Sequence, residues 1–324
     1  MTLKEISRPI EHHLEEFNDY LKGIMNSNVS LLNLIIRYMT KKRGKQLRPI
    51  LVFLAAELCG GVTKRTYTGA AMVELLHNAT LVHDDVVDES TVRRGIASIN
   101  SAWNNKIAVL IGDYLLAKGL LASIDGDEFE FLKITSHSVR RMSEGELLQI
   151  QKSREADTDE ETYFRIISDK TASLMSSCCE IGAASSTDDK GKKEAMKQFG
   201  ENIGIAFQIK DDIFDYQGKD SIIGKPVGND IKEKKLTLPL LYSCNTAPKS
   251  DAAKIIKLVK NGGQSKKDLN TIVEFVNKHN GIKYAEDMAK KFIDRALANL
   301  EIFPESMARE SMEILARFVI DRNL

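Results

Sequence analysis

Two short clusters of aspartates are the residues of this 324-residue chain best suited to chemistry. Their members are Asp84, Asp85 and Asp88 in the first cluster, and Asp211, Asp212 and Asp215 in the second. On a helix, the first and last aspartates of each cluster project from one face, and Gln208 joins the second stripe. Two carboxylates about 6 Å apart repel each other by roughly 3 kcal/mol at an effective dielectric constant of about 20. A divalent cation would relieve this repulsion, and oxygen ligands without His or Cys favour Mg²⁺ completed by water and phosphate oxygens.

A solvated acidic helix face is the alternative interpretation of each cluster, and it usually holds for a single acidic run. The residues ahead of the clusters argue against it, because they are apolar: Leu75, Leu76, Leu81 and Val82 before the first, and Ile203, Ile205 and Phe207 before the second. Such neighbours indicate helices with a buried face. We therefore favour the metal interpretation.

Basic residues that could hold a phosphate group flank the first cluster. Segment 43–49 offers Arg43, Lys45 and Arg48 ahead of an apolar helix expected to begin at Ile50, and a helix start favours anions. The pair Arg93 and Arg94 follows the cluster, while His77 stands seven residues before Asp84 on the same stripe. A basic loop and a structural histidine remain the alternatives for these residues.

A second basic group surrounds the second cluster. Lys170 and Thr171 interrupt an otherwise apolar helical stripe, and a lysine in that position requires an anionic partner. Further lysines follow the cluster at Lys225 and in the run Lys232 to Lys235. Each aspartate cluster thus has its own set of candidate phosphate ligands.

Composition limits the classes of protein that the chain can represent. Lys plus Arg and Asp plus Glu both number 46, so no net charge attracts nucleic acid or an anionic membrane. The four cysteines lack C-x-x-C spacing and are expected to be reduced, as in the cytoplasm. The charged N-terminus has no signal-peptide pattern, and we expect no apolar run of membrane-spanning length and no transmembrane segment.

The elements that must position these residues are predicted to be long helices. No proline lies between Pro49 and Pro226, and no alternating strand pattern persists. Segment 158–181 predicts one amphipathic helix, with Thr158 as its cap and apolar residues every three or four positions. The absence of a low-complexity linker favours a single domain over 1–324.

At this point the sequence resembles the trans-type isoprenyl diphosphate synthase family. The resemblance covers roughly residues 41–239 and is carried by GKQLRP, DDVVD followed by RRG, Lys170-Thr171, FQIKDDIFD and GKPVGNDIKEKKLTLP. It implies a bundle of long antiparallel helices around a deep central cavity, the isoprenoid synthase fold. It also implies a homodimer, and several Mg²⁺ ions that bridge both aspartate clusters to an allylic diphosphate, with Asp84, Asp88 and Asp211 among the metal ligands.

The resemblance also implies a role for each matching residue. Lys45, Arg48, His77 and Arg94 would hold isopentenyl diphosphate. Arg93, Lys170, Thr171, Gln208, Lys225 and Lys235 would surround the allylic diphosphate. The aspartates of both clusters, with Lys170 and Lys225, would be catalytic. Many members have glycine where this chain has Lys234, so either Lys234 or Lys235 is the phosphate contact.

The residues before the first cluster are expected to limit the length of the product. A growing chain would pass Thr80, Ala79, Leu76 and Met72 on the earlier turns of this helix. Short-chain members of the family commonly have an aromatic residue four or five positions before the first aspartate, where this chain has Thr80 and Ala79. We therefore expect a long-chain product of the octaprenyl or solanesyl kind, with a geranylgeranyl- or farnesyl-type short product as the alternative. Close helix packing is the other explanation for Ala79.

The predicted reaction is a condensation that needs no Ser, Cys or His nucleophile. Metal ions and cations make the allylic diphosphate a good leaving group, and the double bond of isopentenyl diphosphate attacks the resulting cation. A terpene cyclase or a head-to-head synthase would leave Lys45, Arg48 and Arg94 unexplained. A non-catalytic subunit of a heteromeric prenyl synthase is the alternative from another class, although intact aspartates argue against it.

Overall fold

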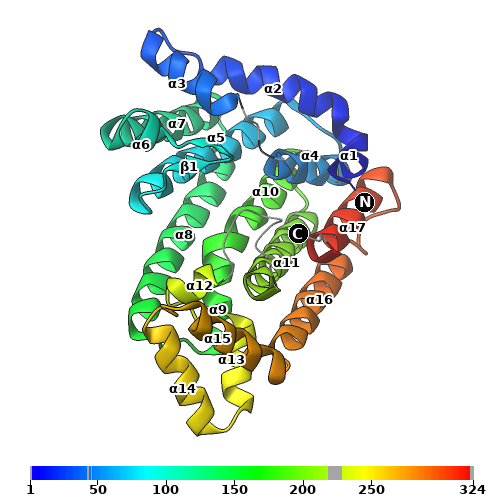
Figure 1. Ribbon diagram of the computed structural model, residues 1–324. Helices are drawn as coiled ribbons and strands as arrows, with labels where there is room; N and C mark the ends of the chain where they lie inside the picture. The colour runs from blue at the N-terminus through cyan, green and yellow to red at the C-terminus, as the bar shows by residue number, and fades with distance from the viewer. Residues whose placement is uncertain (1, 42–43, 45, 218–227, 322–324) are drawn as a thin grey trace. The chain divides into compact units, whose positions relative to one another are not determined.

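The computed structural model describes residues 2–321 except 42–43, 45 and 218–227. Helices form nearly all of the regular structure in these residues, and the strands found there, β1 (Val92–Arg93) and β2 (Ile96–Ala97), have two residues each (Figure 1). The all-α fold expected from the sequence is confirmed.

The chain divides into two compact units. Unit 1 comprises Met1–Ser136, Ser177–Lys197 and Ile302–Met312, and unit 2 comprises His137–Ser176, Gln198–Glu301 and Glu313–Leu324. The segments of the two units alternate along the sequence, and the single domain expected over 1–324 stays a prediction.

The helices have the following bounds. Unit 1 contains α1 (Leu3–Ile6), the 3-10 helix η1 (Arg8–Ile10), α2 (Glu11–Met25), α3 (Ser30–Thr40), α4 (Leu47–Cys59), α5 (Lys64–Val87), α6 (Ile99–Ala102) and α7 (Asn105–Asp125). Unit 2 contains α9 (Glu160–Ile167), the π-helix η2 (Ser168–Ala172), α12 (Asn229–Lys232), α13 (Leu238–Thr246), α14 (Lys249–Lys260), α15 (Lys266–Lys278) and α16 (Gly281–Asn299). Four helices contain residues of both units: α8 (Phe129–Glu155), α10 (Ser173–Ala184), α11 (Lys190–Gln217) and α17 (Met307–Asp321).

The core of unit 1 is built on α4 and α5. Every residue of α4 from Pro49 to Ala56 is buried, which its apolar sequence requires. The helix begins at Leu47 rather than at the expected Ile50, since the chain turns at Gln46, whose φ is 50°. This earlier start places Arg48 in the first helical turn.

Helix α7 packs against α5 through two glycines. A methyl group at Gly112 would lie 2.1 Å from Nε2 of His83, and one at Gly119 would lie 3.5 Å from the carbonyl oxygen of Met72. By length and composition alone, α7 could cross a membrane, which corrects the expectation that no apolar run reaches that length. Core helices of soluble proteins can pass the same test, so this property does not assign α7 to a membrane.

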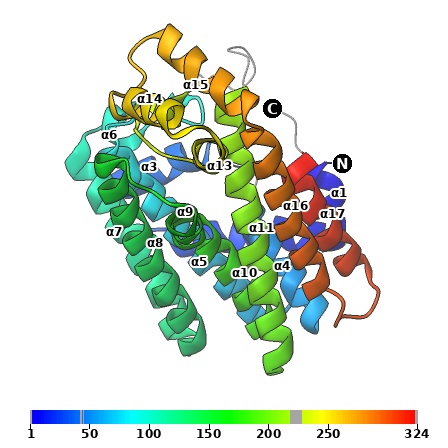
Figure 2. The ribbon, with the colours of Figure 1, turned by 90° about the horizontal axis from the view of Figure 1, so that it is seen from below.

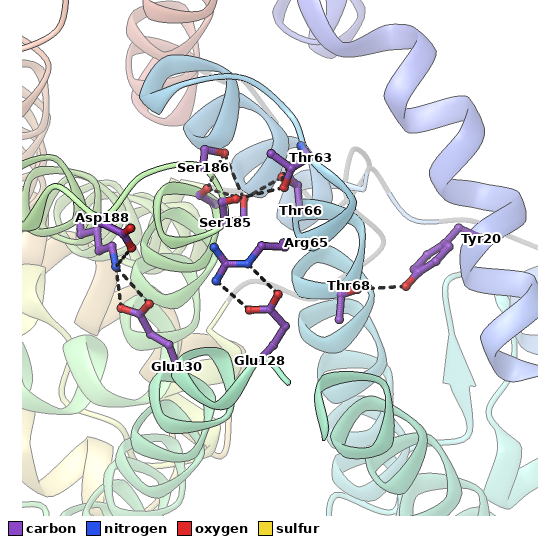
Figure 3. Close-up of polar contacts among 12 residues, drawn as sticks. Tyr20, Thr63, Arg65, Thr66, Thr68, Glu128, Glu130, Ser185, Ser186 and Asp188 are labelled. Atoms are coloured by element: carbon purple, nitrogen blue, oxygen red, sulfur yellow. Dashed lines mark hydrogen bonds and ion pairs between the residues drawn. The ribbon is translucent and has the colours of Figure 1, made fainter. Parts of the chain in front are cut away.

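Polar contacts fix the first turn of α5 (Figure 3). The backbone N–H of Thr63 donates to Oγ1 of Thr66 at 3.0 Å, and Oγ1 of Thr66 lies 2.7 Å from Oγ of Ser185. Arg65 donates two hydrogen bonds to the buried carboxylate of Glu128, at 2.7 and 2.8 Å. The helix that ends in the first aspartate cluster is therefore anchored at its start.

A tight antiparallel hairpin follows the first cluster. Its strands β1 and β2 pair Val92 with Ala97 and Arg93 with Ile96. The two turn residues, Arg94 and Gly95, have φ values of 52° and 73°, as two-residue hairpin turns prefer. The predicted phosphate ligands Arg93 and Arg94 thus come from a strand and from the turn that follows it.

In unit 2 the helix expected over 158–181 is not one regular helix. It begins at Glu160 and is capped by Asp159, whose carboxylate accepts the N–H of Thr162 at 2.7 Å, not by Thr158. The π-helix η2 interrupts it at Ser168–Ala172, and α10 continues the chain. The helices α13 to α16 pack on one another, and α13 also contacts α9 (Figure 2).

Candidate active site

The first aspartate cluster lies at the C-terminal end of α5, and its members differ in exposure. Asp84 and Asp88 are exposed, whereas Asp85 is 3% exposed. Arg93 donates to Oδ1 of Asp85 from Nε, at 2.8 Å, and from Nη2. Asn100 donates to the carbonyl oxygen of Asp85 at 3.1 Å. Asp85 therefore binds the hairpin to the helix end, and two carboxylates of the cluster remain at the surface.

Three predicted phosphate ligands of unit 1 come together around His77. Burial, and then the positive charges of Arg48, Arg94 and Arg93, lower the pKa of His77 to about 2. The imidazole is therefore neutral at physiological pH, and it can donate a hydrogen bond to a phosphate but contributes no charge.

Glu74 supplies negative charge beside these arginines. Burial raises its pKa, while the nearby Arg48 and Arg94 act to lower it. Nε of Arg48 is buried and has no hydrogen-bond partner among the described residues. Since Glu74 opposes more than one positive charge and a buried donor needs an acceptor, this part of unit 1 favours an anionic ligand.

Three of the predicted basic residues, Arg43, Lys45 and Lys225, lie outside the described residues. Beside Lys45, a methyl group at Gly44 would lie 2.9 Å from Nη2 of Arg94. The guanidinium of Arg94 thus packs against the backbone of Gly44.

A pocket in unit 2 brings together most of the residues predicted around the second cluster. Those that line it are Lys170, Thr171, Gln208, Asp212 and Lys235, and Tyr163, Asp230 and Gln149 join them. The side chains come from α8, α9, η2, α11 and α12 and from the residues that follow α12. Residues far apart in the sequence therefore meet in one polar site.

Hydrogen bonds connect four of these residues in a chain. Thr171 donates to Oε1 of Gln208 at 2.9 Å, and Nε2 of Gln208 donates to Oδ1 of Asp212 at 2.8 Å. The hydroxyl of Tyr163 donates to Oδ2 of Asp212 at 2.7 Å. Burial and then the charge of Asp230 raise the pKa of Asp212 to about 8. A cation bound nearby would favour the ionised carboxylate.

Two lysines of the pocket pair with protein carboxylates. Nζ of Lys170 lies 2.5 Å from Oε2 of Glu146. Lys235 forms an ion pair with Glu233 and lies 3.7 Å from Oδ1 of Asp230. Lys234 is exposed, with φ 60°, in the turn after α12. Of the two alternatives left by the sequence, Lys235 is the lysine that lines this pocket.

Asp215 caps the short helix α12. Its Oδ1 and Oδ2 accept the backbone N–H groups of Asn229 and Asp230, each at 3.0 Å. Burial and then the charge of Asp230 raise the pKa of Asp215 to about 6. Asp215 therefore has a structural role that was not expected when it was paired with Asp211 on one helix face.

The donor set suits Mg²⁺ bound together with a phosphorylated ligand. No group of three or more His, Cys, Asp or Glu side chains that could hold a metal occurs among the described residues. Mg²⁺ needs no such group, because it typically binds one or two carboxylates and completes its shell with water and phosphate oxygens. The exposed pair Asp84 and Asp88 offers hard oxygen ligands of this kind.

The residues expected to limit product length line one side of α5. Met72, Leu76 and Ala79 are at most 3% exposed, and Thr80 is half-buried. Sδ of Met72 accepts a hydrogen bond from Ser123 at 2.8 Å. Burial agrees with a channel wall and equally with close helix packing, so their role stays a prediction.

Tyr163, Asp230 and Glu74 are among the residues of these sites that were not predicted from the sequence. Tyr163 stands three and four residues before Ile166 and Ile167, a helical spacing that predicts a core position. Asp230 lies within a run of mixed charge, where nothing indicates a half-buried carboxylate that faces a pocket. Glu74 stands three residues before His77, and that helical spacing could have placed it beside the predicted anion site.

Comparison with known proteins gives consistent matches over nearly the whole chain. The family model described as polyprenyl synthetase matches residues 29–276. The all-trans-nonaprenyl-diphosphate synthase (geranyl-diphosphate specific) of Rhodobacter capsulatus is 36% identical over 320 residues, 98% of each chain. A geranylgeranyl diphosphate synthase of Saccharolobus solfataricus is 34% identical over 333 residues, 99% of each chain. The solved structure of a polyprenyl synthase from Caulobacter crescentus, complexed with calcium and isoprenyl diphosphate, matches with a TM-score of 0.89 at 33% identity and covers 99% of this chain and 98% of that one.

Proposed function

The chain belongs to the polyprenyl synthetase family, and from this premise we propose that it is a trans-polyprenyl diphosphate synthase. It condenses isopentenyl diphosphate with an allylic diphosphate in repeated 1'-4 head-to-tail additions and releases diphosphate. The observation that carries this proposal is that basic and polar side chains suited to phosphate gather in two groups. One surrounds His77 in unit 1 and the other lines the pocket in unit 2. Two diphosphate substrates require two such groups, whereas a terpene cyclase requires one.

Arg48 and Arg94 bind the diphosphate of isopentenyl diphosphate, with Lys45 beside them. The orphaned Nε of Arg48 donates to a phosphate oxygen. Neutral His77 adds a hydrogen bond without adding charge. Glu74 limits the repulsion between the two arginines when the substrate is absent.

Lys170, Thr171, Gln208 and Lys235, with Lys225, hold the allylic diphosphate. When bound, Mg²⁺ held by Asp84, Asp88 and Asp211 would neutralise charge that develops on the departing diphosphate. The C–O bond of the allylic substrate breaks, and C4 of isopentenyl diphosphate forms a bond to allylic C1. A proton then leaves C2 of the new cation for the released diphosphate. Lys170 and Lys235 stabilise that leaving group by charge.

The product is a long prenyl chain of the octaprenyl or solanesyl kind. Its support is the small residue Ala79 above the first cluster, together with the nonaprenyl-diphosphate synthase among the relatives. The geranylgeranyl diphosphate synthase among the relatives keeps a short product as the alternative. The two relatives are 36% and 34% identical to this chain, so the mass of the product is the measurement that distinguishes the two lengths.

The enzyme acts in the cytoplasm as a homodimer that uses α7 at its interface. All four cysteines are free thiols, as a reducing compartment favours. On α7, Val109 and Leu120, and likewise Leu110 and Leu121, are eleven residues apart, and each of these side chains is more than a third exposed. Eleven residues make about three helical turns, so the members of each pair lie on one side of the helix, where a second copy would cover these apolar side chains.

Activity of the purified protein alone is the decisive test. The protein is incubated with Mg²⁺, labelled isopentenyl diphosphate and geranyl or farnesyl diphosphate, and the products are measured by mass. We expect a ladder that ends in a long prenyl diphosphate. A cyclic hydrocarbon would contradict condensation. Activity that appears only with a second polypeptide would favour the non-catalytic subunit.

A further inference from the structure

The π-helix η2 carries two residues assigned above to the allylic diphosphate. Its wide turn is closed by the N–H of Ser173, which donates to the carbonyl oxygen of Ser168 five residues earlier. Oγ of Ser173 donates to the carbonyl oxygen of Asp169 at 2.7 Å. Single π-helical turns are rare and are less favourable than a continuous α-helix. Contacts outside the turn must therefore stabilise it.

Arg141 of α8 provides such contacts on one side. Its Nε donates to Oδ1 of Asp169 at 2.7 Å, and its Nη2 donates to Oγ of Ser168 at 2.8 Å. The same guanidinium binds both carboxylate oxygens of Glu201 on α11, at 2.7 and 3.2 Å. Ser168 also donates to Glu201. One arginine thus ties the first two residues of the π turn to two neighbouring helices.

The side chains of this network are shielded from water. The exposed fractions are 29% for Arg141, 16% for Asp169 and 18% for Glu201. A planar guanidinium that uses three nitrogens at once fixes both distance and orientation. The network is therefore a stiff support rather than a surface ion pair of little weight.

Two glycines support the turn from the same two helices. A methyl group at Gly145 of α8 would lie 2.9 Å from the backbone nitrogen of Lys170. One at Gly204 of α11 would lie 2.5 Å from Cα of Ala172. No larger residue fits at either position unless the turn moves. The backbone of η2 is thus held between α8 and α11 with no spare room.

We infer that Arg141 and Glu201, with Gly145 and Gly204, form a clamp that positions Lys170 and Thr171 for the allylic diphosphate. The clamp residues do not touch the substrate; they act through the π turn. From this turn Lys170 extends into the pocket beside Glu146, and Thr171 donates to Gln208. This inference rests on the proposed function, because it assigns the allylic diphosphate to that pocket.

The test measures steady-state constants for both substrates in Arg141→Gln and Gly145→Ala. The first variant removes the ion pairs, and the second displaces the turn without changing any charge. We expect KM for the allylic diphosphate to rise about tenfold to a hundredfold in each, as misplaced binding groups produce. KM for isopentenyl diphosphate should change by less than about twofold, since its ligands are elsewhere.

Matched controls separate positioning from general damage. Arg140→Gln makes the same change at the exposed neighbour of Arg141 on α8. Gly23→Ala adds a methyl group that meets nothing within 4 Å. Both should keep wild-type constants. Amide hydrogen exchange should become faster at Lys170–Ser173 in the clamp variants, with the melting temperature used to identify any loss of the whole fold.

The outcomes separate this inference from the proposed function. If the wild-type protein is active, unchanged KM values in the clamp variants, or equal changes of KM for both substrates, would overturn the clamp. If Arg141→Gln does not fold, Gly145→Ala and Glu201→Gln decide the question. A wild-type protein without prenyl transfer would refute the proposed function instead. Hydrogen exchange at η2, which needs no turnover, would then still test whether Arg141 holds the π turn.

Discussion

The hydroxyl of Tyr163 lies 2.7 Å from Oδ2 of Asp212, and both side chains are buried. Nε2 of Gln208 donates a hydrogen bond to Oδ1, the other carboxylate oxygen of Asp212. The second aspartate of the first cluster is held in a similar way, by Arg93. In each cluster the middle aspartate is therefore buried and bound by protein donors, which fixes the end of the helix that presents its neighbours.

Removing the tyrosine hydroxyl should weaken catalysis more than it weakens the fold. Tyr163→Phe leaves Oδ2 of Asp212 without its donor, so the carboxylate is no longer held in one orientation. We expect kcat/KM for the allylic diphosphate to fall about tenfold, with a loss of about 1 kcal/mol in the free energy of unfolding. Tyr216→Phe is the control, since it removes a buried hydroxyl contact with Thr237 at 2.9 Å. Equal loss of activity in both variants would contradict a specific role for Tyr163.

The aspartates of the first cluster should separate into metal ligands and a structural residue. Asp84→Asn changes an exposed carboxylate, so it should raise the Mg²⁺ concentration needed for half-maximal activity by about tenfold or more with little change in stability. Asp85→Asn weakens the buried pair with Arg93, so it should also lower the free energy of unfolding by about 1–2 kcal/mol. Magnesium titrations and urea denaturation measure the two effects. Identical results for both variants would show that exposure does not distinguish their roles.

Substitution of His77 should reduce the loss of stability at acidic pH. Its pKa is about 2 in the folded protein, against about 6.5 in an unfolded chain. Below pH 6.5 the unfolded state therefore binds a proton that the folded state does not, and stability falls as pH falls through that value. From pH 7.5 to 5.5 this amounts to about 1.4 kcal/mol. Between these two pH values, the free energy of unfolding of His77→Gln should fall by about 1.4 kcal/mol less than that of wild type. Urea denaturation at each pH measures this difference, and parallel curves of unfolding free energy against pH would contradict the low pKa of His77.

Local sequence patterns could predict the helices but not the contacts between them. Periodicity indicated a helix over 158–181, whereas the π turn within it depends on Arg141, Gly145 and Gly204, which are distant in the sequence. Spacing identified both aspartate clusters. It could not show that Asp85 binds Arg93 or that Asp215 caps α12, because those partners are set by the hairpin and by the chain after residue 227.

The start of α4 illustrates the same limit on a smaller scale. Apolar periodicity placed it at Ile50, but a single left-handed residue, Gln46, lets the helix begin at Leu47. This shift of three residues brings Arg48 onto the helix, where its Nε is buried. Arg48 was predicted as a phosphate ligand from its residue type and spacing. Its burial, however, depends on the left-handed conformation of Gln46, which the sequence pattern does not indicate.

A charge on the exposed face of α7 should separate the proposed dimer. Leu110 is 56% exposed, and Leu110→Glu would place a carboxylate in an apolar interface without disturbing the packing of α7 on α5. We expect light scattering to give the mass of a dimer for wild type and of a monomer for the variant. Lys106→Glu, a charge change at another exposed position of α7, serves as the control. A monomeric wild type would refute the proposed interface outright.

Enlarging Ala79 should shorten the product. The side chain is 2% exposed, five residues and about 7.5 Å along the helix axis before Asp84. If a growing prenyl chain passes this point, the series Ala79→Val, Ala79→Leu and Ala79→Phe should give progressively shorter products by mass, with farnesyl diphosphate as primer. Added volume in a packed core can lower stability by about 1–3 kcal/mol, so melting temperatures are measured in parallel. Ala102→Phe, at the exposed end of α6, should leave the product unchanged. Loss of stability with an unchanged product would mean that Ala79 serves only close packing of helices, and the wall that limits chain length would have to be sought on another element.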